Sequence, residues 1–229
     1  MATGLGNETL WLCPTLDQTN PYDDLSSEGN NGTKVGNVSV VADTGSGGSH
    51  AFSFPGNMMY GDYIDFSSCG ITSGSSHSVA MWAYQQQFSN AVLWYAGQTN
   101  GQRFSTIMGE PYSDWMVGQT SNYLQAGYVD NSVWQHVCYT YDGSDVYLYV
   151  DGQYEADQSD SPVSYSEQQV NLGRYGFNGR IDDFRCFDRV LTTTEIGLLA
   201  SERGYEPAAT GIYNPFANKI FSPGQRTIR

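Results

Sequence analysis

Aromatic side chains alternate along one short segment in a pattern suited to binding sugars. On a strand, Tyr147 and Tyr149 would point to the face opposite Val146, Leu148 and Val150. A tyrosine combines an apolar ring with a polar hydroxyl, so it can stack on sugar C–H groups beside hydrogen-bonding neighbours. We therefore predict Tyr147 and Tyr149 as carbohydrate-binding residues. The alternative is that they fill the core, and the same choice applies to Trp94, Tyr95, Trp115 and Tyr123.

Thiol and imidazole groups do not occur at the spacings of a metal or nucleophile site. The three histidines lie far apart, at positions 50, 77 and 136, and the four cysteines include no C-x-x-C pair. The sequence also lacks G-x-S-x-G, P-loop and dinucleotide motifs. Cys138 and Cys186 lie inside apolar strand patterns, so we predict buried thiols that pack as small hydrophobic groups.

The strands that would position these groups are clearest between residues 134 and 152. Apolar or aromatic residues alternate with polar ones over 134–141 and again over 146–150. Each segment ends in an Asp-Gly pair, Asp142-Gly143 and Asp151-Gly152. Because Asp-Gly supplies the positive φ angles of hairpin turns, the pattern predicts three consecutive antiparallel strands.

Similar short segments recur along the chain. We expect strands at 9–13, 38–41, 50–54, 63–66, 77–85, 91–96, 103–108, 115–117, 123–128, 170–174 and 180–187. Turn residues between them favour a β-sandwich over alternating βαβ units. Residues 14–37 are expected to form a long polar loop, which is a common place for function or a bound ion. Thr192 with Glu195 predicts the capping box of one short helix.

Three segments carry a family resemblance. They are W-x-H-V-x-x-T-Y-D-G with V-x-L-Y-V-D-G from Trp134 to Gly152, the loop from Asp24 to Thr33, and the strand from Asn178 to Arg185. Together they resemble laminin G-like domains, which belong to the concanavalin A-like jelly rolls. In the loop, Glu28 displaces the family spacing D-x-S-G-x-x-N-x-G slightly. We expect an all-β, concanavalin A-like jelly-roll β-sandwich over residues 1–203, with one short C-terminal helix and an extended tail.

The resemblance implies a structural Ca²⁺ between the N-terminal loop and the last strand. Asp24 and Asp182 match the family positions, and Asn30 can add an oxygen. Calcium binds about six to eight oxygens, often from carboxylates and flexible loop carbonyls. The alternative is that Asp24 forms a turn and Asp182 lies on a solvated strand face. The first and last strands of this fold lie near one another, so a disulfide between Cys13 and Cys186 is the pairing to check.

Some hydrolases share this fold and carry E-x-D-x-x-E on one strand, with two carboxylates about 5 Å apart. The nearest segment here runs from Glu155 to Asp160, with Asp157 between them. On a regular strand Glu155 and Asp157 share a face, whereas Asp160 points to the other. Asp160 is also one methylene shorter than glutamate. We therefore predict that the protein is not an enzyme.

The net charge of the chain argues against nucleic acids as partners. The chain has 229 residues, a formal net charge of -14 and only 15% charged residues. Duplex nucleic acids are bound mainly through Lys and Arg, so we expect no nucleic-acid role. The N-terminal residues show no basic segment followed by an apolar core, and no apolar run reaches the ~18 residues of a membrane span. We expect no signal peptide and no membrane span.

The composition changes at residues 204–229. This segment holds three basic residues against one acidic residue, a net charge of +2, and it has no helical or strand period. It nevertheless carries large apolar groups, which a free tail would lack. We predict an assembly arm that packs on the body or on a neighbouring subunit, through Tyr213, Phe216, Phe221, Arg226 and Arg229.

These features together predict a structural or binding protein that forms homo-oligomers. The arm is loosely similar to the tails of laminin G-like proteins in marine phages and environmental bacteria. We therefore expect a virion decoration, cement or appendage protein that contacts host glycans, with the arm bound to other virion subunits. The alternative is a carbohydrate-binding or adhesion module of a bacterial extracellular or cell-surface protein.

Overall fold

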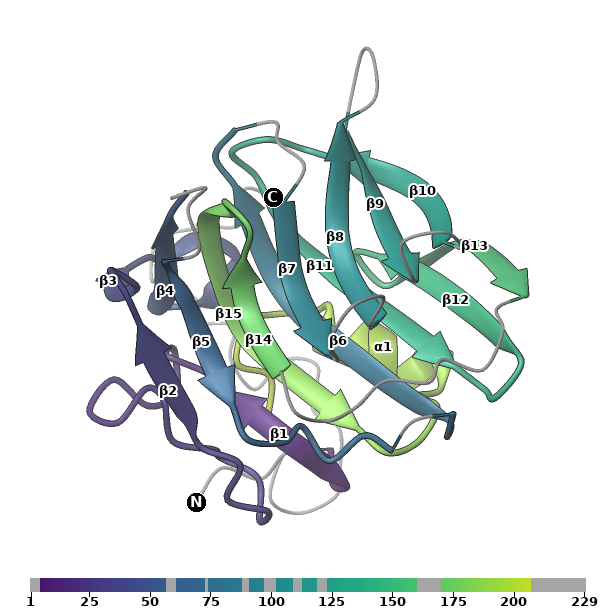
Figure 1. Ribbon diagram of the computed structural model, residues 1–229, viewed down its shortest axis with the longest axis horizontal. Helices are drawn as coiled ribbons and strands as arrows, with labels where there is room; N and C mark the ends of the chain where they lie inside the picture. The colour runs from purple at the N-terminus through teal and green to yellow at the C-terminus, as the bar shows by residue number, and fades with distance from the viewer. Residues whose placement is uncertain are drawn as a thin grey trace, which may run out of the picture.

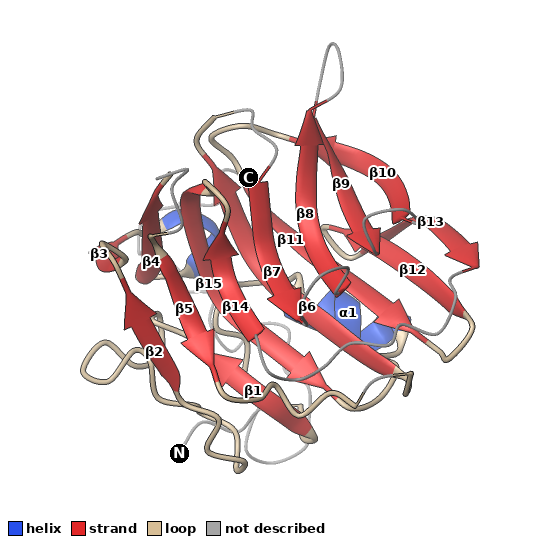
Figure 2. Ribbon diagram, viewed as in Figure 1, coloured by secondary structure: helices blue, strands red, loops and turns tan. Residues whose placement is uncertain are grey.

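The protein folds as two antiparallel β-sheets packed face to face, with a short helix on one outer side (Figure 1). The computed structural model describes residues 5–56, 61–72, 74–87, 91–96, 102–108, 113–118, 123–159 and 170–206. Strands dominate these segments, as Figure 2 shows. The predicted all-β sandwich with one short C-terminal helix is therefore confirmed.

Sheet A has the strand order β13-β12-β11-β6-β15-β4-β3 in the described part of the chain, and β1 pairs with β15. Its strands are β1 (Glu8–Leu12), β3 (Ser39–Ala42), β4 (His50–Pro55), β6 (His77–Gln85), β11 (Trp134–Tyr141), β12 (Asp145–Val150), β13 (Gln153–Ser159) and β15 (Asn178–Phe187). The two Asp-Gly pairs lie at the turns between β11, β12 and β13, so the predicted three-strand meander is confirmed.

Sheet B has the order β10-β9-β8-β7-β14-β5-β2. Its strands are β2 (Gly32–Val35), β5 (Tyr63–Phe66), β7 (Ala91–Ala96), β8 (Gln102–Met108), β9 (Ser113–Gly118), β10 (Tyr123–Val129) and β14 (Val170–Arg174). β2 corrects one prediction, because residues 14–37 are not all loop. Gly32–Val35 pairs with β5, and this long-range partner is not visible in the local pattern.

Apolar side chains from the inner faces fill the space between the sheets. Alternation along each strand turns every second side chain inward, and burial removes these groups from water. The inward groups of sheet A include Phe52, Met81, Val137, Tyr139 and Leu148, and those of sheet B include Ile64, Phe66, Leu93, Trp94 and Leu172.

The helix α1 (Thr193–Leu199) covers the outer face of sheet A. Ile196 and Leu199 pack against Cys138, Tyr149 and Phe187. The predicted capping box is confirmed, because the Thr192 side chain accepts from the Glu195 N–H and the Glu195 carboxylate accepts from the Thr192 N–H. A 3-10 turn, η1 (Gly45–Gly47), lies between β3 and β4. In the described part of the chain, no helix is long and apolar enough to cross a membrane.

All four cysteines are buried free thiols, as predicted for Cys138 and Cys186. Cys13 and Cys186 are not linked. The Cys13 Sγ lies 3.6 Å from Asp182 Oδ1, whereas Cys186 hydrogen-bonds with Cys69. Burial, followed by this hydrogen bond, raises the pKa of Cys186 well above its usual value.

Candidate functional site

A row of polar and aromatic side chains crosses the outer face of sheet B. The strand register places Asp65 of β5 opposite Asn171 of β14, and Asn171 opposite Tyr95 of β7. The adjoining residues on these strands, such as Ile64 and Leu172, belong to the core, so the row faces outward. We call the following residues the sheet B cluster: Tyr63, Asp65, Tyr95, Asn171, Arg174 and Tyr175.

A glycine with left-handed backbone lies in β14 between two of these residues, Asn171 and Arg174. Gly173 has a φ of 80°, and a Cβ there would lie 2.1 Å from the Phe54 ring. Only glycine fits such a position, with its positive φ and no space for a side chain. β14 keeps its register with β7 across this glycine, with Leu172 opposite Trp94 and Arg174 opposite Val92, and the Arg174 side chain contacts Asn171 three residues earlier.

Hydrogen bonds join three residues of the sheet B cluster in a chain. The Asn171 Nδ2 donates to Asp65 Oδ1 at 2.6 Å, and Arg174 Nη1 donates to Asn171 Oδ1 at 2.5 Å. Asn171 is 1% exposed, so its amide is fixed by the sheet around it. This chain orients the Arg174 guanidinium, because a buried amide with both ends bonded has one favourable orientation.

Tyrosine rings surround that guanidinium. The Arg174 Cζ lies 5.3 Å from the Tyr63 ring centre and 4.9 Å from that of Tyr175. Tyr95 meets Tyr175 edge to face, with ring centres 6.2 Å apart. Tyr175 is 39% exposed and has a φ of 56°, which is uncommon for a bulky residue. The sheet B cluster therefore presents ring surface, a carboxylate and a cation, which a buried amide holds in place on the strands.

The chemistry of the sheet B cluster is that of a polar binding surface. Rings can stack on apolar faces of a ligand, while convergent polar groups fix its orientation. The described side chains include no nucleophile paired with a base at this surface. The arrangement can bind and orient a polar ligand.

The predicted sugar-binding residues Tyr147 and Tyr149 lie on the outer face of sheet A. Tyr149 is 8% exposed and packs with α1, so it lies beneath the surface. Tyr147 is half-buried, and its hydroxyl donates to Asp142 Oδ2 at 3.3 Å. The exposed ring at this edge is Tyr154, which is 53% exposed and stands edge to face with Tyr149. A hydrogen bond to Asp157 is the main cause of the raised pKa of Tyr154.

Asp24 and Asn30, two of the predicted calcium ligands, lie together at the end of the N-terminal loop. Asp24 Oδ2 accepts from the Asn30 N–H at 2.8 Å, and Oδ1 accepts from the Trp11 and Ser26 N–H groups. Asn30 donates its side-chain amide to the Thr9 carbonyl. Hydrogen bonds of this kind, from backbone N–H groups to an aspartate side chain, stabilise a turn.

Asp182, the third predicted ligand, is bound by a cation of the protein itself. Its Oδ2 accepts from Arg203 Nε at 2.9 Å and from the Thr15 hydroxyl. Burial raises the pKa of Asp182, against the lowering effect of Arg203. Because Arg203 neutralises this carboxylate, the site does not fit Ca²⁺. Among the described residues, no group of three or more His, Cys, Asp and Glu side chains is arranged to hold a metal.

Comparison with protein families assigns the fold. Residues 56–197 match the laminin G family profile described as the concanavalin A-like lectin/glucanases superfamily. The chain belongs to this superfamily. The match runs from β5 into α1 and includes the β11–β13 meander and the whole sheet B cluster. The predicted laminin G-like resemblance is thereby confirmed at the level of the family. No curated protein sequence matches the chain significantly.

Solved structures share the fold of this concanavalin A-like protein. Domain 4 of an extracellular arabinanase from Geobacillus stearothermophilus, in complex with arabinotriose, superposes with a TM-score of 0.68 and 17% identity, over 87% of this chain and 100% of that domain. The binding domain of Paraclostridial Mosquitocidal Protein 1 gives 0.68 and 16%, over 85% of this chain and 52% of that one. The binding domain of Botulinum Neurotoxin DC in complex with SialylT gives 0.66 and 13%, over 85% and 51%. The match thus spans about half of each toxin binding domain.

A bulge in β13 separates the carboxylates considered for hydrolysis. The β12–β13 register shifts near Tyr149, so Asp157 shares the outer face with Tyr154. Glu155 points instead toward β10, where a Cβ on Gly127 would meet its side chain at 3.3 Å. The expectation that Glu155 and Asp157 share a face is therefore wrong. Asp160 lies outside the described residues.

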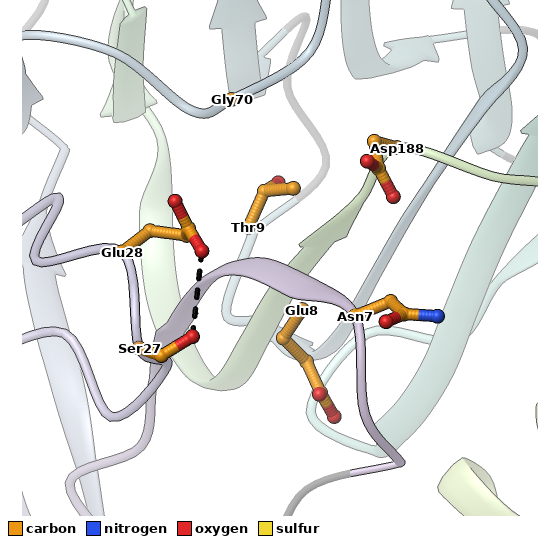
Figure 3. Close-up of a pocket in the computed structure, with 7 residues that line it drawn as sticks. All are labelled: Asn7, Glu8, Thr9, Ser27, Glu28, Gly70 and Asp188. Carbon is orange, nitrogen blue, oxygen red and sulfur yellow. Dashed lines mark hydrogen bonds between the residues drawn. The ribbon is translucent and has the colours of Figure 1, made fainter.

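An acidic pocket of about 300 Å³ lies beside β1 (Figure 3). Glu28 and Asp188 come from opposite sides of it, with Thr9 between them. Ser27 donates to Glu28 within the wall, and Glu8 pairs with Arg185 at 3.3 Å. The lining residues are Asn7, Glu8, Thr9, Ser27, Glu28, Gly70 and Asp188. The pocket has the polarity of a water-filled recess.

The predicted assembly arm lies outside the described residues, with Tyr213, Phe216, Phe221, Arg226 and Arg229. The described chain ends at residue 206. Tyr205 is buried against α1, and its carbonyl accepts from Arg185 Nη2 at 2.5 Å. The chain up to this point is therefore part of the folded body, and the domain boundary at 203/204 stays a prediction.

Sequence reasoning missed most of the sheet B cluster. Asn171 between Val170 and Leu172 is the available signal, because a polar residue inside an apolar strand must find partners. Arg174 and Tyr175 follow it closely, but a regular strand would place Asn171 and Arg174 on opposite faces. Gly173, with its positive φ, interrupts the regular strand geometry between them, and the two side chains are hydrogen-bonded.

Proposed function

We propose that this protein is a non-catalytic carbohydrate-binding module. The observation that carries the proposal is the sheet B cluster, in which exposed ring surface adjoins a fixed carboxylate, amide and guanidinium. Sugars present alternating C–H faces and hydroxyl groups, and this combination of side chains complements both. The ligand would lie across β5, β14 and β7, with Tyr175 as its main stacking surface.

The related structures support this class of function without assigning a ligand. One shared fold belongs to an arabinanase domain in complex with arabinotriose, and another to a neurotoxin binding domain in complex with SialylT. Their identities of 13–17% relate the folds alone. A place outside the cell, where such binding domains work, is part of the same proposal.

A role as a virion decoration, cement or appendage protein stays a prediction. It would use residues 204–229 as an arm that contacts other virion subunits, while the sheet B cluster meets host glycans. None of the comparisons bears on virions. Glycan binding does not depend on this role, so the two can be tested separately.

The test is a glycan array followed by titration of the best ligand with two variants. Tyr175→Asn removes the exposed ring and tolerates the positive φ of that position. Tyr154→Ala removes the exposed ring of the sheet A edge, which adjoins the predicted Tyr147 and Tyr149. We expect Tyr175→Asn to weaken binding about tenfold or more, which is ~1.4 kcal/mol, and Tyr154→Ala to retain wild-type affinity.

Thermal melting of both variants first establishes that each is folded. The reverse result, with affinity lost in Tyr154→Ala and retained in Tyr175→Asn, would move the binding site to the β12–β13 edge. Absence of binding to any glycan on the array would remove the proposed function.

A further inference from the structure

We infer that the ligand of the sheet B cluster is a sugar bearing a single carboxylate, and that Arg174 binds this carboxylate. This inference rests on the proposed carbohydrate-binding function and deepens it. It follows from the hydrogen bonding of the Arg174 guanidinium and from its lack of an ion pair within the described protein.

Arg174 differs from the other arginines whose side chains the structure describes. Each of the others forms an ion pair with a carboxylate of the protein: Arg180, Arg185, Arg189 and Arg203. Arg174 forms none. Its Nη1 donates to an amide oxygen, its Nε is buried without a hydrogen-bond partner, and its Nη2 has no partner in the described protein.

The setting of Arg174 makes an external anion favourable. The guanidinium is half-buried between the Tyr63 and Tyr175 rings, so part of its hydration is already lost. A partly desolvated charge without a counter-ion is costly, and a carboxylate offsets that cost through charge-assisted hydrogen bonds. A neutral hydroxyl group supplies no such compensation.

The neighbouring Asp65 carboxylate does not act as the counter-ion of Arg174. Asp65 bonds the Asn171 amide at 2.6 Å instead of the guanidinium, with Asn171 between them. This spacing leaves Asp65 to accept hydrogen bonds from sugar hydroxyls, while Arg174 receives the acidic group. The Asp65–Asn171–Arg174 chain thus sets an acceptor and a cation at fixed positions along one ligand.

The charge of the whole protein limits the ligand to one negative group. A body with a net charge of -14 repels polyanions at long range. One half-buried guanidinium can outweigh this repulsion for a single carboxylate at contact, but not for a highly charged chain. A terminal uronic acid or a sialic acid has the required chemistry.

The experiment compares sugars that differ in a carboxylate, using the full chain. One pair is methyl glucuronide and methyl glucoside, and the other is sialyllactose and lactose. The pairs distinguish the two sources of the acidic group. We expect the acidic member of one pair to bind at least tenfold more tightly than its neutral partner, by calorimetry or saturation-transfer NMR.

Two arginine variants then locate the effect. Arg174→Gln is expected to reduce the acidic-to-neutral affinity ratio to about one. Arg189→Gln, which removes a cation paired with Glu195 beside α1, is expected to keep the wild-type ratio. Melting curves control for folding, and Arg174→Lys reports whether charge alone suffices without the planar guanidinium.

The outcomes distinguish a failure of the Arg174 assignment from a failure of the carbohydrate-binding function. Equal binding of acidic and neutral sugars, or a preference that survives in Arg174→Gln, would overturn the assignment of Arg174 and leave the carbohydrate-binding function standing. If neither the array nor these sugars bind, both the function and this inference fail.

Discussion

At the scale of single residues, two arginines on the outer face of sheet A repeat one arrangement. Arg203 stacks over Trp134 at 4.0 Å, and the Trp134 indole N–H donates to Asp43, which also bonds Arg203. Arg185 stacks over Trp11 at 3.9 Å in the same way, with Asp183 as the shared acceptor. Because each charge is paired and stacked, these buried ions fasten the N-terminal and C-terminal segments to the sheet.

Removing one member of such a network should be costly. We predict that Arg203→Met lowers the free energy of unfolding by ~3–5 kcal/mol, because it leaves Asp43 and Asp182 buried with less compensation. Arg189→Met, at the partly exposed pair with Glu195, should lower it by no more than about 1 kcal/mol. Urea unfolding measures both. Similar losses in the two variants would contradict the dominance of the buried network.

Buried histidines predict the pH dependence of stability. Burial lowers the pKa of His77 to about 4, and burial followed by the Arg185 charge lowers that of His136 to about 3. Below its ordinary value of ~6.5, each imidazole takes up a proton in the unfolded chain but not in the folded protein. The free energy of unfolding should therefore fall as the pH decreases from about 7 to 4, approaching ~1.4 kcal/mol per pH unit for each histidine.

Urea unfolding at several pH values tests this dependence. His136→Gln removes one titrating group, so its stability should fall less steeply over the same range, whatever its stability at pH 7. A variant with the slope of the wild type would exclude His136 as a source of the acid sensitivity.

At the scale of elements, β14 contains a left-handed glycine, Gly173, between Asn171 and Arg174 of the sheet B cluster. We predict that Gly173→Ala lowers the free energy of unfolding by ~1–3 kcal/mol or more, because its Cβ would meet Phe54 and its φ is positive. Gly197→Ala in α1 is the matched control. A Cβ there meets nothing within 4 Å, so helix propensity should make this variant more stable by ~0.5–1 kcal/mol. Chemical denaturation shows whether each variant loses or gains free energy of unfolding. A Gly173→Ala variant as stable as the wild type would contradict the close packing of this position against Phe54.

The strands could be predicted well from sequence, whereas the candidate site could not. Alternation and Asp-Gly turns are local signals, so the β11–β13 meander followed from the residues alone. Gly32–Val35 lacks such a pattern and becomes a strand only by pairing with β5. The sheet B cluster joins residues 63–65, 95 and 171–175, whose proximity depends on strand order and on the left-handed backbone at Gly173. The burial of Tyr149 under α1 could not be predicted, because the docking of this helix over sheet A has no signal in the strand sequence itself.

At the scale of the whole molecule, the protein is an acidic sandwich whose N-terminal loop and last strand are held by hydrogen bonds and ion pairs within the chain. Arg203 bonds Asp182, and backbone N–H groups satisfy Asp24, so the two carboxylates are already compensated. Chelation by EDTA should therefore shift the melting temperature by less than about 2 °C, the effect of roughly 1 kcal/mol or less in a chain of this size. Added calcium should likewise have no effect. A larger fall on chelation would restore the calcium site at Asp24, Asn30 and Asp182.

At this scale we propose that the outer face of sheet B is the surface that binds a glycan. NMR titration of the isotopically labelled full chain with the best glycan tests this most directly, because backbone amides report the location of binding. We predict shifts concentrated at residues 63–65, 95 and 171–175, with the β12–β13 edge unchanged. Shifts concentrated at residues 147–157 instead would contradict it.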